Sequence, residues 1–265
     1  MPDKDFTVLI LGDIIGRSGI RAVISGLSSL VKQHGADFVL ANGENSAGGF
    51  GITQEIAGQL FAAGVHVITT GNHIWQQSEV FPYLDQEDRI LRPANYPGGN
   101  PGHGHCVVEA RGVRVGVINL QGRRRLYPID CPFRKAKETI RKISSSADII
   151  IIDVHAEATE EKEALAFFLD GQVNALFGTH THIQTADDRI LPGGTGYLTD
   201  LGACGPADSV IGFDPQISVE RVRSQMPLRN EVSDNVAVLH GAVLTVSRAD
   251  WKTVVFHRFQ ERSLV

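Results

Sequence analysis

The chain has 265 residues, of which 42% are hydrophobic and 21% charged, and its formal net charge at pH 7 is −5. This length can bury a large core, and the composition is that of a globular protein, which excludes a disordered chain. The negative charge argues against binding to duplex nucleic acid, but a small phosphate substrate stays open because metal ions supply positive charge locally.

The cysteines and the apolar runs indicate the compartment. Cys106, Cys131 and Cys204 are scattered and form no CxxC pair, which argues against a disulfide framework and against a thiolate zinc site. No apolar run approaches the length of a membrane span, and the polar start of the chain does not resemble a signal peptide. We therefore expect a cytoplasmic protein without a membrane partner. No linker-like segment divides the sequence, so we predict a single domain over residues 1–265.

The first part of the chain alternates between strand-like and helical patterns. Apolar runs of strand length cover residues 6–11, 37–41 and 65–70. A helical repeat follows the first run, and the second is followed by a helix that we expect to be capped by Thr53 and stopped by Gly64. This alternation predicts strands that pack against helices.

The later part of the chain favours hairpins. Residues 105–110 and 113–120 flank a turn at Arg111-Gly112, and a second hairpin is expected from residues 236–246 and 253–259. Between the hairpins the sequence predicts two helices, one at 134–143 and one that begins at Thr159. It also predicts strands at 148–154, 173–177 and 196–199. Alternation followed by hairpins indicates a mixed sheet or two packed sheets, with helices outside.

Polar side chains follow five of the strand-like runs at the point where each run ends. They are Asp13, Glu44 with Asn45, Asn72 with His73, His155, and His180 with His182. In open α/β sheets the carboxyl ends of the strands form the usual ligand crevice, so we expect these groups to meet on one rim. The two histidines of Gly178-Thr179-His180-Thr181-His182 would point to opposite sides of extended backbone, which lets them serve two metal ions.

These donor types indicate the kind of metal. Carboxylate, amide and imidazole ligands suit iron, manganese or zinc, and the absence of thiolates argues against soft metals. Glu44 is the candidate for a bridging carboxylate because its neighbours on both sides are polar. Two ions roughly 3.5–4 Å apart would clamp a phosphate and generate hydroxide from a bridging water.

Simpler interpretations compete with the metal site. Aspartate and asparagine after a strand are commonly helix caps or turn residues, and His155 could be a hydrogen-bonded core histidine. For the run of arginines at 123–125, a solvated loop is favoured over a phosphate clamp. Gly12, Gly16 and Gly19 resemble a phosphate-binding turn, but Ile14 occupies the second glycine position of the dinucleotide fingerprint, which disfavours a nucleotide-binding Rossmann fold.

Taken together, these segments resemble the calcineurin-like metallophosphoesterases, and more closely their bacterial YmdB-like branch of 2′,3′-cyclic-nucleotide 2′-phosphodiesterase-like proteins. The resemblance covers nearly the whole chain, through a linked order of specific motifs. They are LGDIIGRSG from Leu11, NGENSAGGFGIT from Asn42, GNHIW from Gly71, LRPANYP from Leu91, DVHAEATEEKEA from Asp153, GTHTHIQTAD from Gly178 and GPADSVIG from Gly205.

The resemblance implies a fold and a set of ligands. The fold would be an α/β, four-layer α/β/β/α sandwich of two mixed sheets. One metal ion would be held by Asp13, Glu44 and His182, and the other by Glu44, Asn45, Asn72, His155 and His180. His73 would be the catalytic proton donor to the leaving group. Ile15 and Glu44 stand where the wider superfamily has a histidine and a bridging aspartate, and both departures fit the YmdB-like branch.

We therefore expect a metal-dependent phosphodiesterase that hydrolyses 2′,3′-cyclic nucleotides or related small phosphodiesters by a dinuclear metal-hydroxide mechanism. Its cofactors would be two divalent or trivalent ions, with iron or manganese favoured by the resemblance and zinc left open. A broad nucleotide phosphatase remains an alternative enzyme. A regulatory partner protein in which catalysis is secondary is an alternative from another class, and a homo-oligomer is left open.

Overall fold

The larger of two β-sheets has seven strands in the order β13–β12–β11–β1–β2–β3–β4, in a computed structural model that describes residues 5–263. Strands β1 to β4 run parallel, β12 pairs antiparallel with β1, and β13 pairs antiparallel with β12. These strands are β1 (Phe6–Ile15), β2 (Phe38–Asn45), β3 (Val67–Thr69), β4 (Ile90–Leu91), β11 (Ala203–Pro206), β12 (Ala237–Val246) and β13 (Thr253–Arg262).

The smaller sheet has six strands in the order β5–β6–β7–β8–β10–β9. The four central strands run parallel, and the edge strands β5 and β9 pair antiparallel with their neighbours. The strands are β5 (His105–Ala110), β6 (Val113–Gln121), β7 (Ile149–His155), β8 (Ala175–Thr179), β9 (Arg189–Ile190) and β10 (Gly196–Leu198). Both predicted hairpins, β5–β6 and β12–β13, are confirmed.

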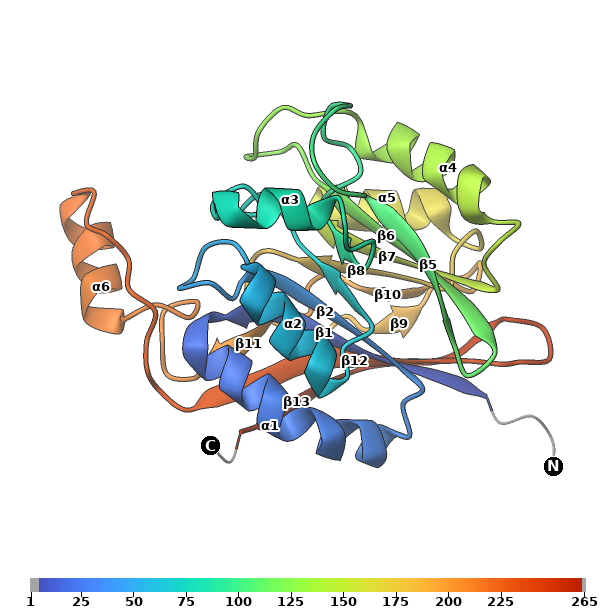
Figure 1. Cartoon of the computed structure of the whole chain (residues 1–265), viewed down its shortest axis with the longest axis horizontal. Helices are drawn as coiled ribbons and strands as arrows, with labels where there is room; N and C mark the ends of the chain where they lie inside the picture. Colours follow the sequence, from blue (N-terminus) through green and yellow to red (C-terminus); the bar gives the residue numbers. More distant parts are fainter. Residues whose placement is uncertain (1–4, 264–265) are drawn as a thin grey trace.

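Helices cover the outer faces of the two sheets (Figure 1). On the larger sheet lie α1 (Gly16–His34) and α2 (Gln54–Ala63), and on the smaller sheet lie α4 (Pro132–Ile143) and α5 (Thr159–Leu169). Thr53 caps α2 by accepting a hydrogen bond from the backbone of Ile56, and Gly64 ends the helix at a φ of 113°, as the sequence predicts.

Two further segments lie outside these layers. The short helices η1 (Ser78–Val80) and α3 (Phe81–Leu84) follow β3, and α6 (Pro215–Ser224) projects from the body on the connection between β11 and β12 (Figure 1). The sequence did not predict α6, whose described residues include one buried side chain, Ser218. None of the helices within residues 5–263 is long and apolar enough to cross a lipid bilayer.

Three apolar cores separate the four layers. Strand β1 shows why, because alternate residues belong to different cores: Leu9 and Leu11 pack toward the helices, whereas Val8 and Ile10 pack toward the second sheet. A third core lies between the smaller sheet and its helices. All ten residues of β1 are buried, which explains its nearly continuous apolar sequence. The α/β/β/α sandwich of two mixed sheets is therefore confirmed.

Candidate metal centre

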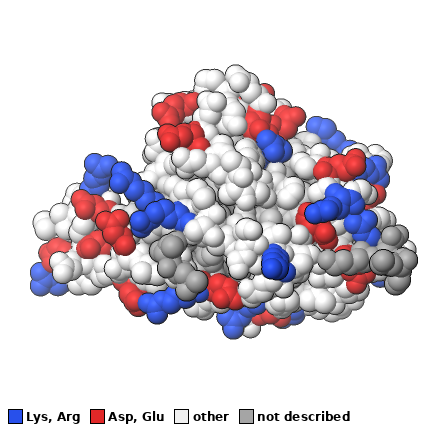
Figure 2. Space-filling view, turned by 60° about the horizontal axis from the view of Figure 1, so that its bottom comes forward, with Lys and Arg blue, Asp and Glu red and all other residues white. Residues whose placement is uncertain are grey.

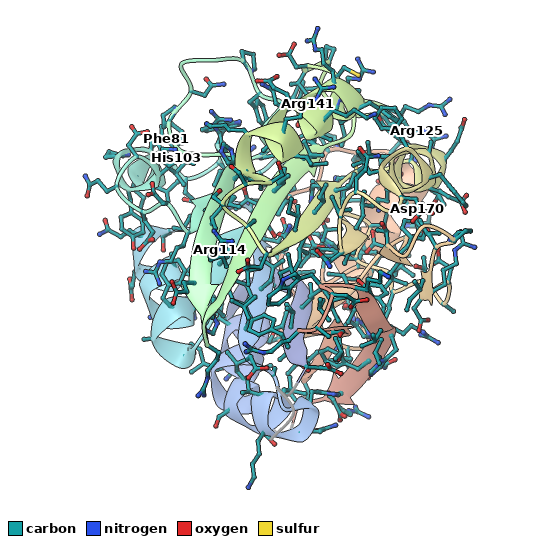
Figure 3. All side chains as sticks on the ribbon, turned by 90° about the vertical axis from the view of Figure 1, so that its right-hand side faces the viewer. Phe81, His103, Arg114, Arg125, Arg141 and Asp170 are labelled. Carbon is teal, nitrogen blue, oxygen red and sulfur yellow. The ribbon has the colours of Figure 1, made fainter. Side chains whose placement is uncertain are left out.

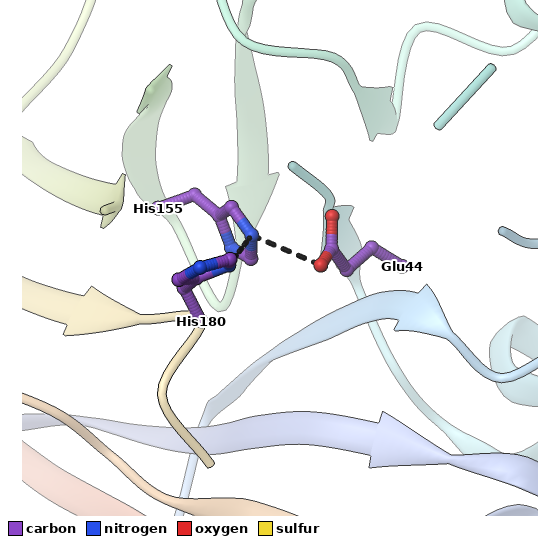
Figure 4. A group of neighbouring side chains, drawn as sticks. All are labelled: Glu44, His155 and His180. Carbon is purple, nitrogen blue, oxygen red and sulfur yellow. Dashed lines mark hydrogen bonds and ion pairs between the residues drawn. The ribbon is translucent and has the colours of Figure 1, made fainter. Parts of the chain in front are cut away.

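One group of predicted ligands gathers around a single nitrogen atom of His155, at the carboxyl end of β7. Its Nε2 lies 2.9 Å from Oε1 of Glu44, 3.0 Å from Nδ1 of His180 and 3.1 Å from Oδ1 of Asn72. Figure 4 shows the Glu44, His155 and His180 side chains converging from separate strand ends. Residues up to 136 positions apart in the chain, from Glu44 to His180, thus share one buried cluster.

A second group lies around His182. Its Nε2 is 2.8 Å from the Asn45 side-chain amide and 4.0 Å from Oδ1 of Asp13. Asp13 is fully buried, and its Oδ2 accepts a hydrogen bond of 3.2 Å from the backbone N–H of His180. Its Oδ1 has no hydrogen-bond partner among residues 5–263. A buried carboxylate oxygen left unpaired is costly unless a cation binds it.

Asn45 lies with a different group from the one that the resemblance implies. Its amide contacts His182 and Nδ1 of His73, at 2.8 Å each, rather than His155 or His180. Asn45 and Glu44 are successive residues at the end of β2, so their side chains leave the strand in different directions. Asn45 therefore faces the Asp13 side of Glu44.

Each of the three clustered histidines is oriented through its other ring nitrogen. Nδ1 of His155 lies 2.9 Å from Oγ1 of Thr179, and Nδ1 of His182 lies 2.8 Å from the carbonyl oxygen of Ile211. Nε2 of His180 lies 3.3 Å from the Glu157 carboxylate. These partners accept the ring N–H, which leaves the second nitrogen of each ring to face the cluster, as in metal-binding histidines.

Thr179 is itself oriented by a buried carboxylate. Its hydroxyl donates to Asp153 at 2.8 Å, so its oxygen can accept the N–H of His155. Asp153 also accepts hydrogen bonds from Thr69 and from Asn42. Sequence reasoning missed this carboxylate as a functional residue. The signal was present, because Asp153 is an acidic residue inside the apolar run of β7.

The loop that carries the histidine pair is not extended, which corrects the sequence expectation. Strand β8 ends at Thr179, and His180 and His182 have φ angles of 99° and 65°. Left-handed backbone at a residue other than glycine costs about 1–3 kcal/mol. Two hydrogen bonds to side-chain carboxylates hold this conformation. The backbone N–H of His180 donates to Asp13 and that of Thr181 donates to Asp200, each at 3.2 Å.

Asp200 is in turn held by a buried lysine. Nζ of Lys162, on α5, lies 2.7 Å from Oδ2 of Asp200, and both side chains are 1% exposed. The lysine stem packs against Gly178, because a Cβ at that glycine would lie 2.6 Å from Cδ of Lys162. Sequence reasoning also missed this pair, because a lysine in an amphipathic helix normally lies at the surface.

We expect Lys162→Met to destabilise the protein by about 3–5 kcal/mol, because it keeps the volume of the stem but leaves the buried Asp200 carboxylate without its cationic partner. Denaturant unfolding measures the change. The matched control is Arg189→Gln, which breaks an exposed ion pair of 2.7 Å with Glu163 and should cost at most about 1 kcal/mol. Equal losses in the two variants would contradict a stabilising role for the buried pair.

Burial and mutual interaction shift the ionisation of the cluster. Burial alone would lower the pKa of His155, but the carboxylates of Glu44 and Asp13 outweigh it and raise that pKa to about 9. Burial and the charge of His155 lower the pKa of His180 to about 3. Burial raises the pKa of Asp13 well above its usual range, whereas His155 holds the pKa of Glu44 well below it despite burial.

These observations fit a metal ion. The ligand atoms of Glu44, His155 and His180 all lie within 4.8 Å of one another. The nitrogen at the centre of the first group has one hydrogen to donate, yet three acceptor atoms lie around it. A cation can be bound by several of these lone pairs at once, and a cation beside Asp13 would satisfy its unpaired oxygen.

His73 lies at the edge of the cluster. Its backbone N–H donates to Oε2 of Glu44 at 3.0 Å, and its Nδ1 lies 2.8 Å from Oδ1 of Asn45. Its side chain is 25% exposed, while that of Glu44 is 1% exposed. The ring is therefore attached to the cluster and still within reach of a bound molecule.

The arginine run lies farther out. Backbone N–H groups of Arg123 and Arg124 donate to the Glu161 carboxylate, at 3.0–3.1 Å, which fixes the loop on α5. The side chain of Arg125 is 82% exposed, and Figure 3 shows it at the surface beside α5. Elsewhere, acidic and basic side chains are interspersed on the face shown in Figure 2, with no broad basic stripe among its described residues.

The fold is shared with solved structures that include a phosphatase. A novel phosphatase from Mycoplasma pneumoniae is 33% identical, with a TM-score of 0.92 over 98% of this chain and 94% of that one. A hypothetical protein from Thermus thermophilus is 35% identical, with a TM-score of 0.91 over 97% of this chain and 100% of that one. A putative 5′-nucleotidase from Staphylococcus aureus, 14% identical, has the same fold with a TM-score of 0.62, over 97% of this chain and 54% of that one. The sandwich is thus of the metallophosphoesterase class.

The chain belongs to the YmdB-like proteins, because residues 9–259 match the model of that family. A relative from Bacillus subtilis (strain 168), named 2′,3′-cyclic-nucleotide 2′-phosphodiesterase, is 42% identical over 251 residues, 95% of each chain. A putative phosphatase/phosphodiesterase from Mycoplasma pneumoniae is 36% identical over 245 residues, 90% of this chain and 86% of that one. The family expected from the sequence motifs is confirmed.

Proposed function

We propose that the protein is a metal-dependent phosphodiesterase that hydrolyses 2′,3′-cyclic nucleotides or related small phosphodiesters. The observation that carries the proposal is the convergence of carboxylate, amide and imidazole donors from separate strand ends around Glu44. The name of the Bacillus subtilis relative supports the substrate class. A broad nucleotide phosphatase would use the same donors, so substrate preference must separate the two activities.

The donors divide into two groups that share Glu44. We assign one ion to Asp13, Glu44, Asn45 and His182, and the other to Glu44, Asn72, His155 and His180. When bound, such ions supply positive charge that stabilises the phosphoryl oxygens during the displacement and Lewis acidity that activates water. Iron or manganese fits the donor set and the family resemblance, and zinc accepts the same ligands.

His73 is the proposed proton donor. Its Nδ1–H can donate to Oδ1 of Asn45, 2.8 Å away, and Oε1 of Glu44 lies 3.4 Å from the same nitrogen. These contacts fix the ring and leave Nε2 to give its proton to the departing ribose oxygen. A 2′,3′-cyclic ester needs that proton because an alkoxide is a poor leaving group.

A substrate panel combined with elemental analysis tests the proposal. We expect adenosine 2′,3′-cyclic phosphate to be opened to adenosine 3′-phosphate, with a kcat/KM above those for adenosine 3′,5′-cyclic phosphate and adenosine monophosphate. A chelator should abolish the reaction, and added manganese or iron should restore it. Preference for the monoester would favour the phosphatase, and full activity in protein free of metal would overturn the metal centre.

Gly71→Ala should greatly reduce metal binding at the proposed centre. A Cβ at Gly71 would lie 2.1 Å from the His155 ring and 2.4 Å from Oε2 of Glu44, so the methyl group must displace proposed ligands. We expect bound metal and activity to fall at least about tenfold. Elemental analysis and kcat/KM measure the loss. Gly58→Ala is the matched control, because a Cβ there meets no atom of the described residues within 4 Å. Unchanged metal content in Gly71→Ala would contradict the assignment.

A further inference from the structure

An aromatic side chain lies directly beside the proposed proton donor. The ring of Phe50 meets the ring of His73 edge to face, with centroids 5.1 Å apart and an interplanar angle of 77°. Phe50 is half-buried. None of the proposed chemistry uses this side chain, and a phenyl ring can bind neither a metal ion nor a phosphate.

The loop that carries Phe50 is held in one conformation. It continues directly from Glu44 and Asn45, and the backbone N–H of Gly49 donates to the carbonyl of Asn45 at 3.1 Å. The carbonyl oxygen of Phe50 accepts a hydrogen bond of 2.8 Å from the side chain of Gln77. Gly49 and Gly51 have φ angles of 93° and 82°, which a larger residue rarely adopts. The position of the Phe50 ring is therefore a built feature of the site.

A second aromatic ring supports the first. Phe213 stacks on Phe50 with centroids 5.7 Å apart and an interplanar angle of 26°, and it is 6% exposed. Its segment is joined to the metal centre, because the carbonyl oxygen of Ile211 accepts the hydrogen bond from Nδ1 of His182. A Cβ at Gly49 would lie 3.1 Å from the Phe213 ring, so the glycine permits this close stacking. The segments that carry the aromatic pair are thus both attached to the group around His182, one through Asn45 and the other through His182 itself.

We propose that Phe50, supported by Phe213, is the surface on which the nucleobase of the substrate stacks. The inference rests on the proposed function. In a 2′,3′-cyclic nucleotide the base is bonded to C1′, the atom next to C2′, whose oxygen takes the proton from His73. The base therefore lies within one sugar ring of the His73 imidazole. Phe50 is the aromatic residue whose ring contacts that imidazole.

Stacking of this kind sets the expected substrate class. Every base has a π-face, so all four common nucleosides should bind, and purines should bind better because they offer a larger face. Loss of one stacking side chain typically weakens binding roughly 5- to 100-fold. A sugar phosphate without a base should gain little from Phe50. The subsite therefore distinguishes nucleotides from other small cyclic phosphodiesters.

The test compares two esters in the metal-loaded enzyme: adenosine 2′,3′-cyclic phosphate and methyl riboside 2′,3′-cyclic phosphate, which lacks a base. We expect Phe50→Ala to lower the ratio of their kcat/KM values roughly 5- to 100-fold. Phe50→Trp should keep or raise the ratio, because tryptophan also stacks. Phe167→Ala, which truncates an exposed ring on α5, is the matched control and should leave the ratio unchanged.

Calorimetry with the two products, adenosine 3′-phosphate and methyl riboside 3-phosphate, gives a readout that does not depend on turnover. Phe50→Ala should weaken binding of the first product far more than binding of the second. Equal losses for both molecules would mean that Phe50 only orients His73 or its loop, and would overturn the base subsite. Failure of the parent enzyme to open either cyclic ester would overturn the proposed function instead, while selective product binding would still support the subsite.

Discussion

Glu44→Gln should remove the metal ions and lower kcat/KM for a 2′,3′-cyclic nucleotide roughly a thousandfold. Glu44 is fully buried, and its Oε1 lies between the two groups, 2.9 Å from Nε2 of His155 and 3.4 Å from Nδ2 of Asn45, while Oε2 accepts the backbone N–H of His73. Glutamine preserves the volume but replaces one oxygen by an N–H donor and removes the charge. A carboxylate can hold two cations, whereas a neutral amide offers one oxygen and repels a cation at its nitrogen.

Elemental analysis of the purified variant and kcat/KM on the cyclic ester check this result. The matched control is Glu160→Gln, because Glu160 is an exposed carboxylate paired with Arg124 on the outside of α5. The control should retain its metal and its rate. If Glu44→Gln kept two equivalents of metal and parental activity, Glu44 could not be the shared ligand, and the arrangement around it would have another purpose.

His73→Ala should keep the metal ions but lower kcat for a cyclic nucleotide roughly 10²–10⁴-fold. The proposed ligands do not include His73, so their geometry survives its truncation, although Asn45 and Phe50 lose a neighbour. The loss should be much smaller for bis(p-nitrophenyl) phosphate, because p-nitrophenolate departs without a proton. The contrast between the two esters identifies proton donation to the leaving group as the step that His73 serves.

The measurement is the ratio of kcat values for the two esters, with bound metal determined on the same samples. His103→Ala is the matched control, because His103 is a half-exposed histidine that pairs with Asp88 at 3.0 Å. It should change neither the ratio nor the metal content. A loss of equal size for both esters in His73→Ala would point to a role in binding or metal retention, and the assignment as proton donor would be wrong.

Much of the fold follows from local sequence patterns. Strands β1 and β7 are buried along their whole length, so their sequences are nearly continuous apolar runs that are easily recognised. The cap at Thr53 and the stop at Gly64 are likewise local chemical signals. Helix α6 escaped prediction because it has no core-facing apolar stripe: Val219 and Val222 are 59% and 73% exposed.

The supporting residues of the candidate metal centre were harder to find than the proposed ligands. A histidine or acidic residue at the end of an apolar run is visible because it breaks a pattern, as Asp13 and His155 do. Lys162 stands on the buried stripe of α5 with Leu165 and Leu169, but a lysine at such a position can extend its charge to solvent, and only its contact with Asp200 shows that the charge is buried. The pairing of two residues 38 positions apart depends on how α5 packs on the strands.

The sequence by itself determined which residues offer donor atoms of the kinds that bind metals and that they stand at or near strand ends, because strand length and donor chemistry are local properties. Only the tertiary structure decided which of those residues share a site. Asn45 joins His182, 137 positions away, and the left-handed backbone at His180 and His182 is stabilised by hydrogen bonds to Asp13 and Asp200. Such contacts arise from the packing of two sheets, and the packing energy that holds them comes from the three apolar cores.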